Sequence, residues 1–468
     1  MPGRFFCPAF LKEKTYMEKL FQLKAHGTTV KTEIAAGATT FVSMVYILAV
    51  NPAMLADAGM DSAAVFTATA VSAAIGTLFM AFFTNYPIAL ASGMGMNAYF
   101  AYSVCGELAA EGIDDPWKVA LAAVFTEGIV FIILSLCNFR EKLINDVPSN
   151  LKYAITGGVG LFITFIGLQG AGVIIASPST LVDMGSFKSP EFVLAIAGTM
   201  LVAILYRFQV KGYILIGILA TWILGMLAEA AGWYVPDPQN GVYSLFPDIS
   251  AGLLIPAAPE FLSFDFSWAA EHIVHFCFIT FSFLYVDLFD TVGGLIGIAS
   301  KGDMLDKNGN LPKAKGALLA DACGTVAGAA LGTSTVTTYI ESSAGVVNGG
   351  RTGLTAVTTA VLFIAALLFS PIFLAIPSFA TAPALVWVGL LMMDCIKKID
   401  FEGDIADVVS GFFAMVMMPF TYSVSNGIMF GILSWVFLKA ITGKAKEIPA
   451  IMWISSLLFV LRIITLVA

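Results

Sequence analysis

Long apolar runs that follow one another along the whole chain constrain its fold more than any other feature. Most runs approach the ~20 residues that a helix needs to cross a bilayer. Apolar residues make up 58% of the chain and charged residues only 12%, against roughly 25% charged in a soluble protein. The sequence therefore predicts an all-α protein with about fourteen transmembrane segments. These runs lie near residues 33–52, 63–84, 88–104, 117–138, 150–173, 190–207, 212–231, 268–299, 314–332, 334–348, 352–373, 379–396, 405–422 and 424–440.

The composition excludes several other classes of protein. The chain has 24 basic and 32 acidic residues and a net charge of −8, which argues against binding to nucleic acid. The apolar content excludes a disordered chain. The six cysteines lack the spacing of a metal site, and we expect them to be small buried apolar side chains.

The basic residues test the number of crossings, because cytoplasmic loops of membrane proteins are enriched in Lys and Arg. With the N-terminus inside and fourteen crossings, 21 of the 24 basic residues fall on the cytoplasmic side. We therefore expect a multi-pass membrane protein with both ends of this set in the cytoplasm. A last apolar run at 449–467 is either a fifteenth crossing or lies along the interface.

The two halves of the chain resemble each other. VKGYILIGILATW (210–222) is similar to SNGIMFGILSW (425–435), and each stretch closes a set of seven segments. The third segment of each set, 88–104 and 334–348, is short and rich in Gly, Ser and Thr. Inverted repeats with interrupted segments are typical of secondary transporters that bind their substrate at the bilayer midplane. Chance similarity between apolar helices is the alternative.

The eighth segment carries two acids in the expected membrane span. Asp287 and Asp290 are three residues apart and share one helix face. Two close carboxyl groups in an apolar setting favour binding of a shared proton. The alternative is that one of them, Asp290 more than Asp287, braces a neighbouring broken helix.

The two interrupted segments supply further candidates. Glu341 follows a run of Thr and Ser and lies among small residues, where irregular backbone can line a cavity. In the third segment, Pro87 and the turn around Gly95 predict an extended start and a short helix from about Asn97. Such a helix start offers free N–H donors to a ligand.

Other intramembrane polar residues give weaker signals. Glu127, Gln169 and Asp321 could each line a cavity or brace two helices. His272 and His275 are expected at the membrane interface, and the neighbouring acid gives only weak support for a metal site.

Five ordered blocks of this chain resemble the AzgA-like purine permeases of the nucleobase transporter superfamily. The resemblance begins near residue 17, and the preceding 16 residues do not match. It implies a proton-coupled importer of purine bases in the plasma (inner) membrane, with a seven-plus-seven inverted repeat divided into a transport core and a gate. The blocks are GATTFVSMVYILAVNPAML (37–55), GMGMNAYFAY (93–102), VDLFDTVGGLIG (286–297), GTSTVTTYIESSAG (332–345) and GGRTGLTAV (349–357).

In the terms of this family, the chain divides into a cytoplasmic tail, two core parts, two gate parts and an extracytoplasmic connection. The tail is 1–32 and the connection is 233–267. The core parts are 33–138 and 268–373, and the gate parts are 139–232 and 374–468.

The resemblance also implies roles for individual residues. Gly95 and Asn97 match substrate contacts of the third segment, Asp287 and Asp290 match the paired acids of the eighth, and Glu341 matches the acid of the tenth. We expect Glu341, Asp287 and Asn97 to hold the base, with Asp290 fixing the geometry or sharing the proton with Asp287. A carboxylate accepts two N–H groups from guanine or one from hypoxanthine. Adenine needs a donor at N1 instead, so guanine and hypoxanthine are expected to be favoured.

We therefore expect a carrier and not an enzyme. Its partners would be a purine base, a proton as coupling ion without any other cofactor, and the lipid bilayer. A homodimer is compatible with the sequence, and no binding to nucleic acid is expected. The alternatives are an anion carrier of the sulfate or bicarbonate kind with the same fold, and a channel or structural membrane protein.

Overall fold

The computed structural model describes residues 18–137, 146–236, 244–246, 256–302, 304–306 and 311–467. The N-terminal extension and part of the 233–267 connection lie outside these residues. Within them, nine helical spans are long and apolar enough to cross a membrane. They are α2 (Val30–Met44) with α3 (Ile47–Ala56), α4 (Ser62–Thr84), α7 (Pro116–Leu136), α9 (Ser149–Gly170), α10 (Pro190–Arg207), α11 (Tyr213–Ala230), α16 (Gly353–Ala366) with α17 (Ser370–Leu374), α18 (Ser378–Met393) and α20 (Val424–Ile441).

The other predicted segments are helical as well, apart from the two interrupted ones. The eighth, ninth and thirteenth segments form α13 (Ile273–Lys301), α14 (Ala314–Leu331) and α19 (Ile405–Phe420). The last apolar run forms α21 (Ala450–Val467). A short helix, α12 (Ser267–Glu271), precedes α13.

The interrupted segments pair with each other through short strands. In the third segment, β1 (Leu90–Ser92) leads into α5 (Met94–Ala98), a π-helical turn (Tyr99–Val104) and α6 (Cys105–Ala110). In the tenth, β4 (Val336–Thr338) leads into α15 (Ser342–Val347). The two strands are antiparallel, with Ala91 opposite Thr337. This pairing satisfies backbone groups that an unwound segment would otherwise leave without hydrogen bonds inside a membrane.

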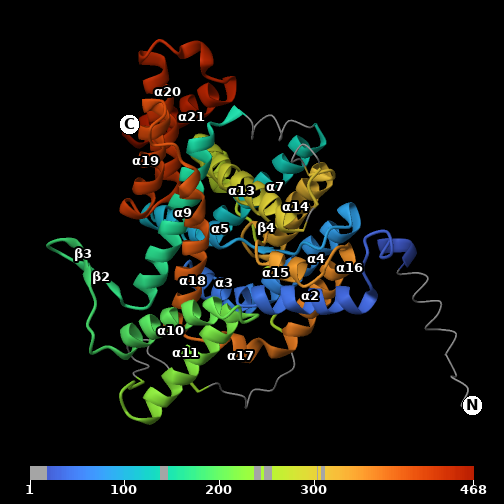
Figure 1. Ribbon diagram of the computed structural model, residues 1–468. Coiled ribbons are helices and arrows are strands. Elements are labelled where there is room, and N and C mark those ends of the chain that lie inside the picture. Colours follow the sequence, from blue (N-terminus) through green and yellow to red (C-terminus); the bar gives the residue numbers. More distant parts are fainter. Residues whose placement is uncertain are drawn as a thin grey trace, which may run out of the picture.

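The helices pack in two groups, and the paired strands pack against α4, α13 and α14 of one of them (Figure 1). In one group, α4 packs against α14 and α16, α2 against α16, and α7 against α13 and α14. In the other, α9 packs against α18 and α19, α10 against α11 and α18, and α19 against α20. Each group therefore combines segments from both halves of the chain.

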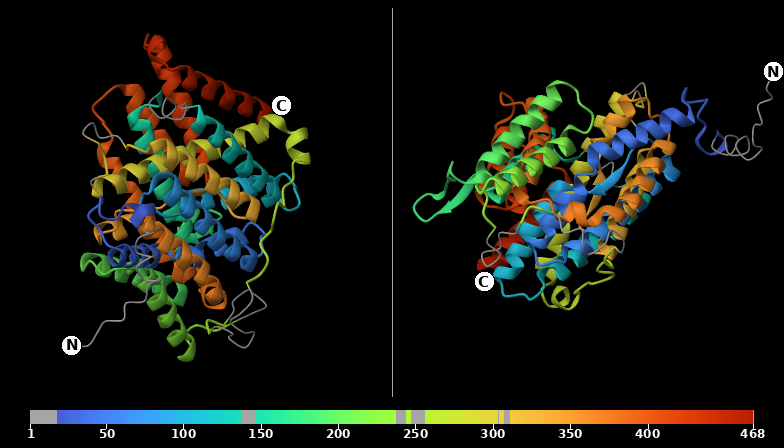
Figure 2. Two further views of the ribbon diagram at one scale, coloured as in Figure 1. Left: turned by 90° about the vertical axis from the view of Figure 1, so that its right-hand side faces the viewer. Right: turned by 90° about the horizontal axis from the view of Figure 1, so that it is seen from below.

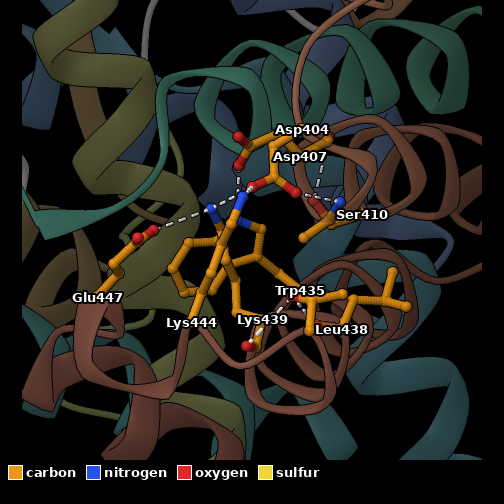
Figure 3. Close-up of polar contacts among 10 residues, drawn as sticks. Asp404, Asp407, Ser410, Trp435, Leu438, Lys439, Lys444 and Glu447 are labelled. Atoms are coloured by element: carbon orange, nitrogen blue, oxygen red, sulfur yellow. Dashed lines mark hydrogen bonds and ion pairs between the residues drawn. The ribbon is translucent and has the colours of Figure 1, made fainter.

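Side-chain caps define where several of these helices begin. Thr29, Asp61, Ser189 and Ser423 each accept a hydrogen bond from a backbone N–H in the first turn of the helix that follows. Asp404 does the same for α19, and its carboxylate also accepts from two lysines (Figure 3). The caps satisfy N–H groups that have no partner within the helix.

Two elements extend beyond the two groups. A hairpin of β2 (Ile174–Ser177) and β3 (Leu181–Met184) projects from the body of the molecule (Figure 2). The helix α21 packs against α20 and α13, where the Phe459 ring lies 5.7 Å from that of Phe278. At its far end, Arg462 forms an ion pair with Glu107 of α6.

Candidate functional site

The paired strands position the acid of the tenth segment. Glu341 follows β4 and precedes α15, and its side chain is half-buried. The hydroxyl of Tyr46, which directly precedes α3, donates a hydrogen bond of 2.6 Å to Glu341 Oε1. Because Tyr46 is fully buried, its hydrogen bond holds the Glu341 carboxyl group in a defined position.

The two acids of the eighth segment lie in different surroundings. Asp287 is completely buried, and its Oδ1 accepts a hydrogen bond of 3.1 Å from Thr291. Asp290 is half-buried, and its Oδ2 would lie 3.6 Å from a Cβ built on Gly93. Asp290 also interacts electrostatically with Asp321 of α14 and with Glu341. Asp290 therefore interacts with the acid of the tenth segment and also with a buried acid of the ninth.

Asn97 lies deeper in the protein than the sequence predicts. The helix begins at Met94 and not near Asn97, because Gly93 ends the strand. The Asn97 N–H is consequently used inside the helix, bonding to Gly93 O at 2.8 Å. The Asn97 side chain accepts from Ser334 through Oδ1, while Nδ2 has no acceptor among the described residues.

Gly95 faces the other helix group. A Cβ built on Gly95 would lie 2.6 Å from Val159 Cγ1 of α9, closer than any real side chain allows. The absence of a side chain at this position is therefore explained by helix packing between α5 and α9.

Two of the weaker sequence candidates join Asp287 in a buried cluster. Glu127 of α7 and Asp321 of α14 are both completely buried. The Thr291 hydroxyl lies 2.8 Å from Asp321 Oδ1, and Glu127 lies within hydrogen-bonding reach of Asp287. Thr335 donates to Glu127 Oε2 at 3.0 Å. The sequence showed that these acids lie in apolar segments, but it gave no information that three helices bring them together.

The remaining candidates lie elsewhere. Gln169 is exposed near the end of α9. His275 pairs with Glu107 at 3.4 Å and with Glu111 at 3.7 Å, and this group could hold a metal ion by its spacing. However, Arg462 contacts Glu107 and already supplies a positive charge there, so the group is better described as an ion-pair network.

Aromatic side chains of the second helix group lie near Glu341. Tyr213 of α11 interacts electrostatically with both Glu341 and Tyr46. Its hydroxyl accepts a hydrogen bond of 3.1 Å from Trp387 Nε1 of α18, and Tyr206 packs on the same indole ring. The half-buried acid therefore lies between the paired strands and an aromatic cluster.

Comparison with known proteins identifies the family. The profile of the xanthine/uracil permeases, described as "Permease family", matches residues 31–430. The chain belongs to this family. Its members are transporters and not enzymes, which agrees with the expectation from the sequence.

Several relatives match over almost their entire length. A putative permease of Methanocaldococcus jannaschii is 44% identical over 96% of this chain and 99% of its own. A guanine/hypoxanthine permease of Bacillus subtilis, PbuO, is 42% identical over 96% of this chain and 100% of its own. An adenine permease of Escherichia coli, AdeP, is 39% identical over 96% of each chain.

Solved structures show the fold. The transmembrane domain of the cyanobacterial bicarbonate transporter BicA superposes with a TM-score of 0.62 at 15% identity, covering 86% of this chain and 97% of that one. SLC26A9 gives 0.63 at 11% identity, covering 93% and 70%. These identities are too low to inform the substrate. They confirm the predicted seven-plus-seven membrane fold.

Proposed function

We propose that this protein is a proton-coupled symporter that imports purine bases across the plasma membrane. The observation that carries the proposal is the half-buried Glu341 carboxyl, which Tyr46 holds at the end of an interrupted segment. A carboxylate in this position can accept hydrogen bonds from the N–H edge of a flat neutral base. The names of the relatives, guanine/hypoxanthine and adenine permeases, support the substrate class.

Within this proposal, Glu341 and Asp290 accept N–H groups of the base, and the Asn97 amide offers a donor. The unpartnered Asn97 Nδ2 supports that assignment. Gly95 allows α5 to approach α9 closely beside the site. Asp287 shares Thr291 with Asp321 and lies within hydrogen-bonding reach of Glu127, so we assign it to the proton and not, as expected from the sequence, to the base.

The same chemistry favours 6-oxopurines over adenine. Guanine presents N1–H and an exocyclic amine to one carboxylate, and hypoxanthine presents N1–H. Adenine presents an unprotonated N1, which an ionised acid cannot bind. The names of two Bacillus subtilis relatives, both guanine/hypoxanthine permeases, agree with this preference.

We further propose that the two helix groups act as core and gate. The group that includes α2, α4, α7, α13, α14 and α16 carries the candidate site and would move against the group around α9, α18 and α19.

The distribution of basic residues supports a cytoplasmic N-terminus.

The test is uptake of labelled hypoxanthine by cells that lack their own purine transporters and express this protein. Unlabelled guanine and hypoxanthine should compete strongly and adenine weakly, and a protonophore should abolish accumulation. Strong competition by adenine alone would refute the preference. Accumulation that survives the protonophore would refute the coupling to protons.

A further inference from the structure

Two fully buried glutamates compensate for burial in different ways. Glu33 of α2 accepts from the backbone N–H groups of Arg351 and Thr352 at 2.9 and 3.2 Å. It also accepts from the Thr352 and Thr355 hydroxyls at 2.8 and 2.7 Å. Glu127 accepts a single hydrogen bond, from Thr335. A buried carboxylate is costly without donors, and Glu33 has four donors whereas Glu127 has one among the described residues.

The second oxygen of Glu127 faces another acid. Glu127 Oε1 receives no hydrogen bond from any donor in the described chain, although the residue has no exposed surface. The Asp287 carboxyl lies within hydrogen-bonding reach of Glu127. Two carboxylate oxygens are both acceptors, so they can remain in contact only if a proton lies between them.

The charged groups that face Glu127 come from two of the helices packed against α7. They are Asp287 on α13 and Asp321 on α14, and both are acids. The Thr291 hydroxyl links the two acids, since it lies within donating distance of Asp287 Oδ1 at 3.1 Å and of Asp321 Oδ1 at 2.8 Å. It also lies 2.8 Å from the Thr337 hydroxyl, which follows Val336 in β4. The cluster therefore gathers three acids at a place without solvent.

We infer that Glu127 and Asp287 together form the proton-binding site of the transport cycle, separate from the carboxyl groups that contact the base. This inference rests on the proposed function as a proton-coupled carrier. One carboxyl group of the pair carries the proton and donates it to the other, and the pair releases that proton when the site opens to the cytoplasm.

Strand β4 connects this pair to the base. Thr335, which donates to Glu127, begins the stretch that ends at Glu341, and Thr337 and Tyr339 lie between them. The hydroxyl of Tyr339 also donates to Ser92 O of β1 at 2.7 Å. If Glu341 moves when the base binds, the movement would therefore shift the Thr335 hydroxyl that donates to Glu127. Binding of the base would in this way be coupled to binding of the proton.

The experiment compares base exchange with proton entry in liposomes that contain the full chain and an internal pH dye. Exchange of external labelled hypoxanthine for internal unlabelled hypoxanthine moves no net proton. Net uptake of hypoxanthine acidifies the interior if a proton accompanies the base. The variant is Glu127→Gln, because an amide N–H can replace the bridging proton and donate to Asp287. The matched control is Glu33→Gln, another buried glutamate whose oxygens have donors.

We expect Glu127→Gln to exchange hypoxanthine while hypoxanthine-driven acidification falls to the level of empty liposomes. In the wild type, a membrane potential of about 100 mV would drive roughly 40-fold accumulation for one proton per base. In Glu127→Gln this accumulation should be absent. Glu33→Gln should retain acidification per molecule of folded protein. If Glu127→Gln is not recovered folded, Glu127→Met has similar length without a titratable group and should behave in the same way.

Acidification by Glu127→Gln at the wild-type rate would overturn the inference. Loss of exchange together with acidification, in protein that elutes as a single folded species, would also overturn it, because Glu127 would then support the base site. Failure of the wild type to exchange hypoxanthine would instead refute the proposed substrate, and wild-type exchange without acidification would refute proton coupling itself.

Discussion

At the scale of single residues, the structure separates acids that the sequence presents as equivalent. Asp287 and Asp290 are three residues apart on one helix, yet one is completely buried and the other is half-buried beside Gly93. Burial therefore provides a criterion for assigning roles. We therefore propose that the half-buried acids contact the base and that the buried Asp287, which lies beside Glu127, takes part in proton binding.

Glu341→Gln is the sharpest single-residue prediction. The amide replaces one acceptor oxygen with a donor, which opposes the N–H edge of the base. Loss of a hydrogen bond to a charged group costs about 1.5–3 kcal/mol, so binding of hypoxanthine should weaken roughly 10- to 100-fold. Equilibrium binding of labelled hypoxanthine to purified protein measures this effect.

The control for that measurement is Glu447→Gln. Glu447 lies near Lys439 at 3.5 Å, with a mostly exposed side chain, and should leave binding unchanged. Wild-type affinity in Glu341→Gln would show that this carboxyl group does not contact the base.

At the scale of elements, helix ends explain the placement of several charges. Glu33 lies in the first turn of α2, and its carboxylate binds the N–H groups at the start of α16. These two helices are in close contact along their length, since a Cβ on Gly37 would lie 2.5 Å from Thr355 O. Glu33 therefore joins the first and eleventh segments.

Glu33→Ala is expected to destabilise this pair of helices. It leaves two hydroxyls and two backbone N–H groups without their acceptor in a buried position, at a cost on the order of 3 kcal/mol. The melting temperature in detergent should fall by several degrees, while Glu447→Ala should have little effect. An unchanged melting temperature would show that water reaches this helix end.

A second helix end gives a prediction about pH. The ammonium groups of Lys439 and Lys444 and the backbone N–H of Ala406 hold the pKa of Asp404 well below its usual range. The two lysines lie 2.7 and 2.6 Å from Asp404 Oδ2 (Figure 3). Because the pKa of Asp404 is lower in the folded than in the unfolded state, the ion pairs stabilise the folded protein at any pH above the unfolded-state pKa. This stabilisation is lost as the pH falls through the folded-state pKa.

Asp404→Asn should therefore lower the melting temperature equally at pH 7.5 and pH 5. The difference from the wild type should shrink only below about pH 4, where the unfolded-state aspartates become protonated. Thermal unfolding at several pH values tests this. A difference that already disappears at pH 5 would contradict the assigned ion pairs.

Much of the fold could be predicted because each membrane crossing requires an apolar segment of sufficient length, and such segments can be recognised in the sequence. The segment boundaries and the two interrupted segments follow from apolar length and from clusters of Gly, Ser and Thr. The start of α5 at Met94 and the β2–β3 hairpin could not be predicted, since both depend on local turn geometry. The cluster around Glu127 was also inaccessible, because it depends on how three separate helices pack.

At the scale of the whole molecule, the two helix groups meet beside the candidate site, where α5 and α13 contact α9. Gly95 of α5 contacts Val159 of α9 there, with the built Cβ of Gly95 4.0 Å from Val159 Cβ. That separation lies within the range of a disulfide. A bond between these positions would hold the two groups together.

In a background with the exposed Cys137 and Cys277 changed to serine, Gly95→Cys with Val159→Cys should lose transport under oxidising conditions. A reducing agent should restore it, because the core could again move against the gate. Val159→Cys alone and the reduced double variant are the controls, because Gly95→Cys alone would place its Cβ 2.6 Å from Val159 Cγ1. Full transport in the cross-linked protein would exclude relative movement of the two groups at this contact.

The most direct test of the central claim is uptake of labelled hypoxanthine into liposomes that contain only the purified protein, under an imposed pH gradient that is acidic outside. We predict that hypoxanthine accumulates inside above its external concentration and that a protonophore abolishes this accumulation. Equal internal and external concentrations with the gradient intact would contradict proton-coupled purine transport by this protein.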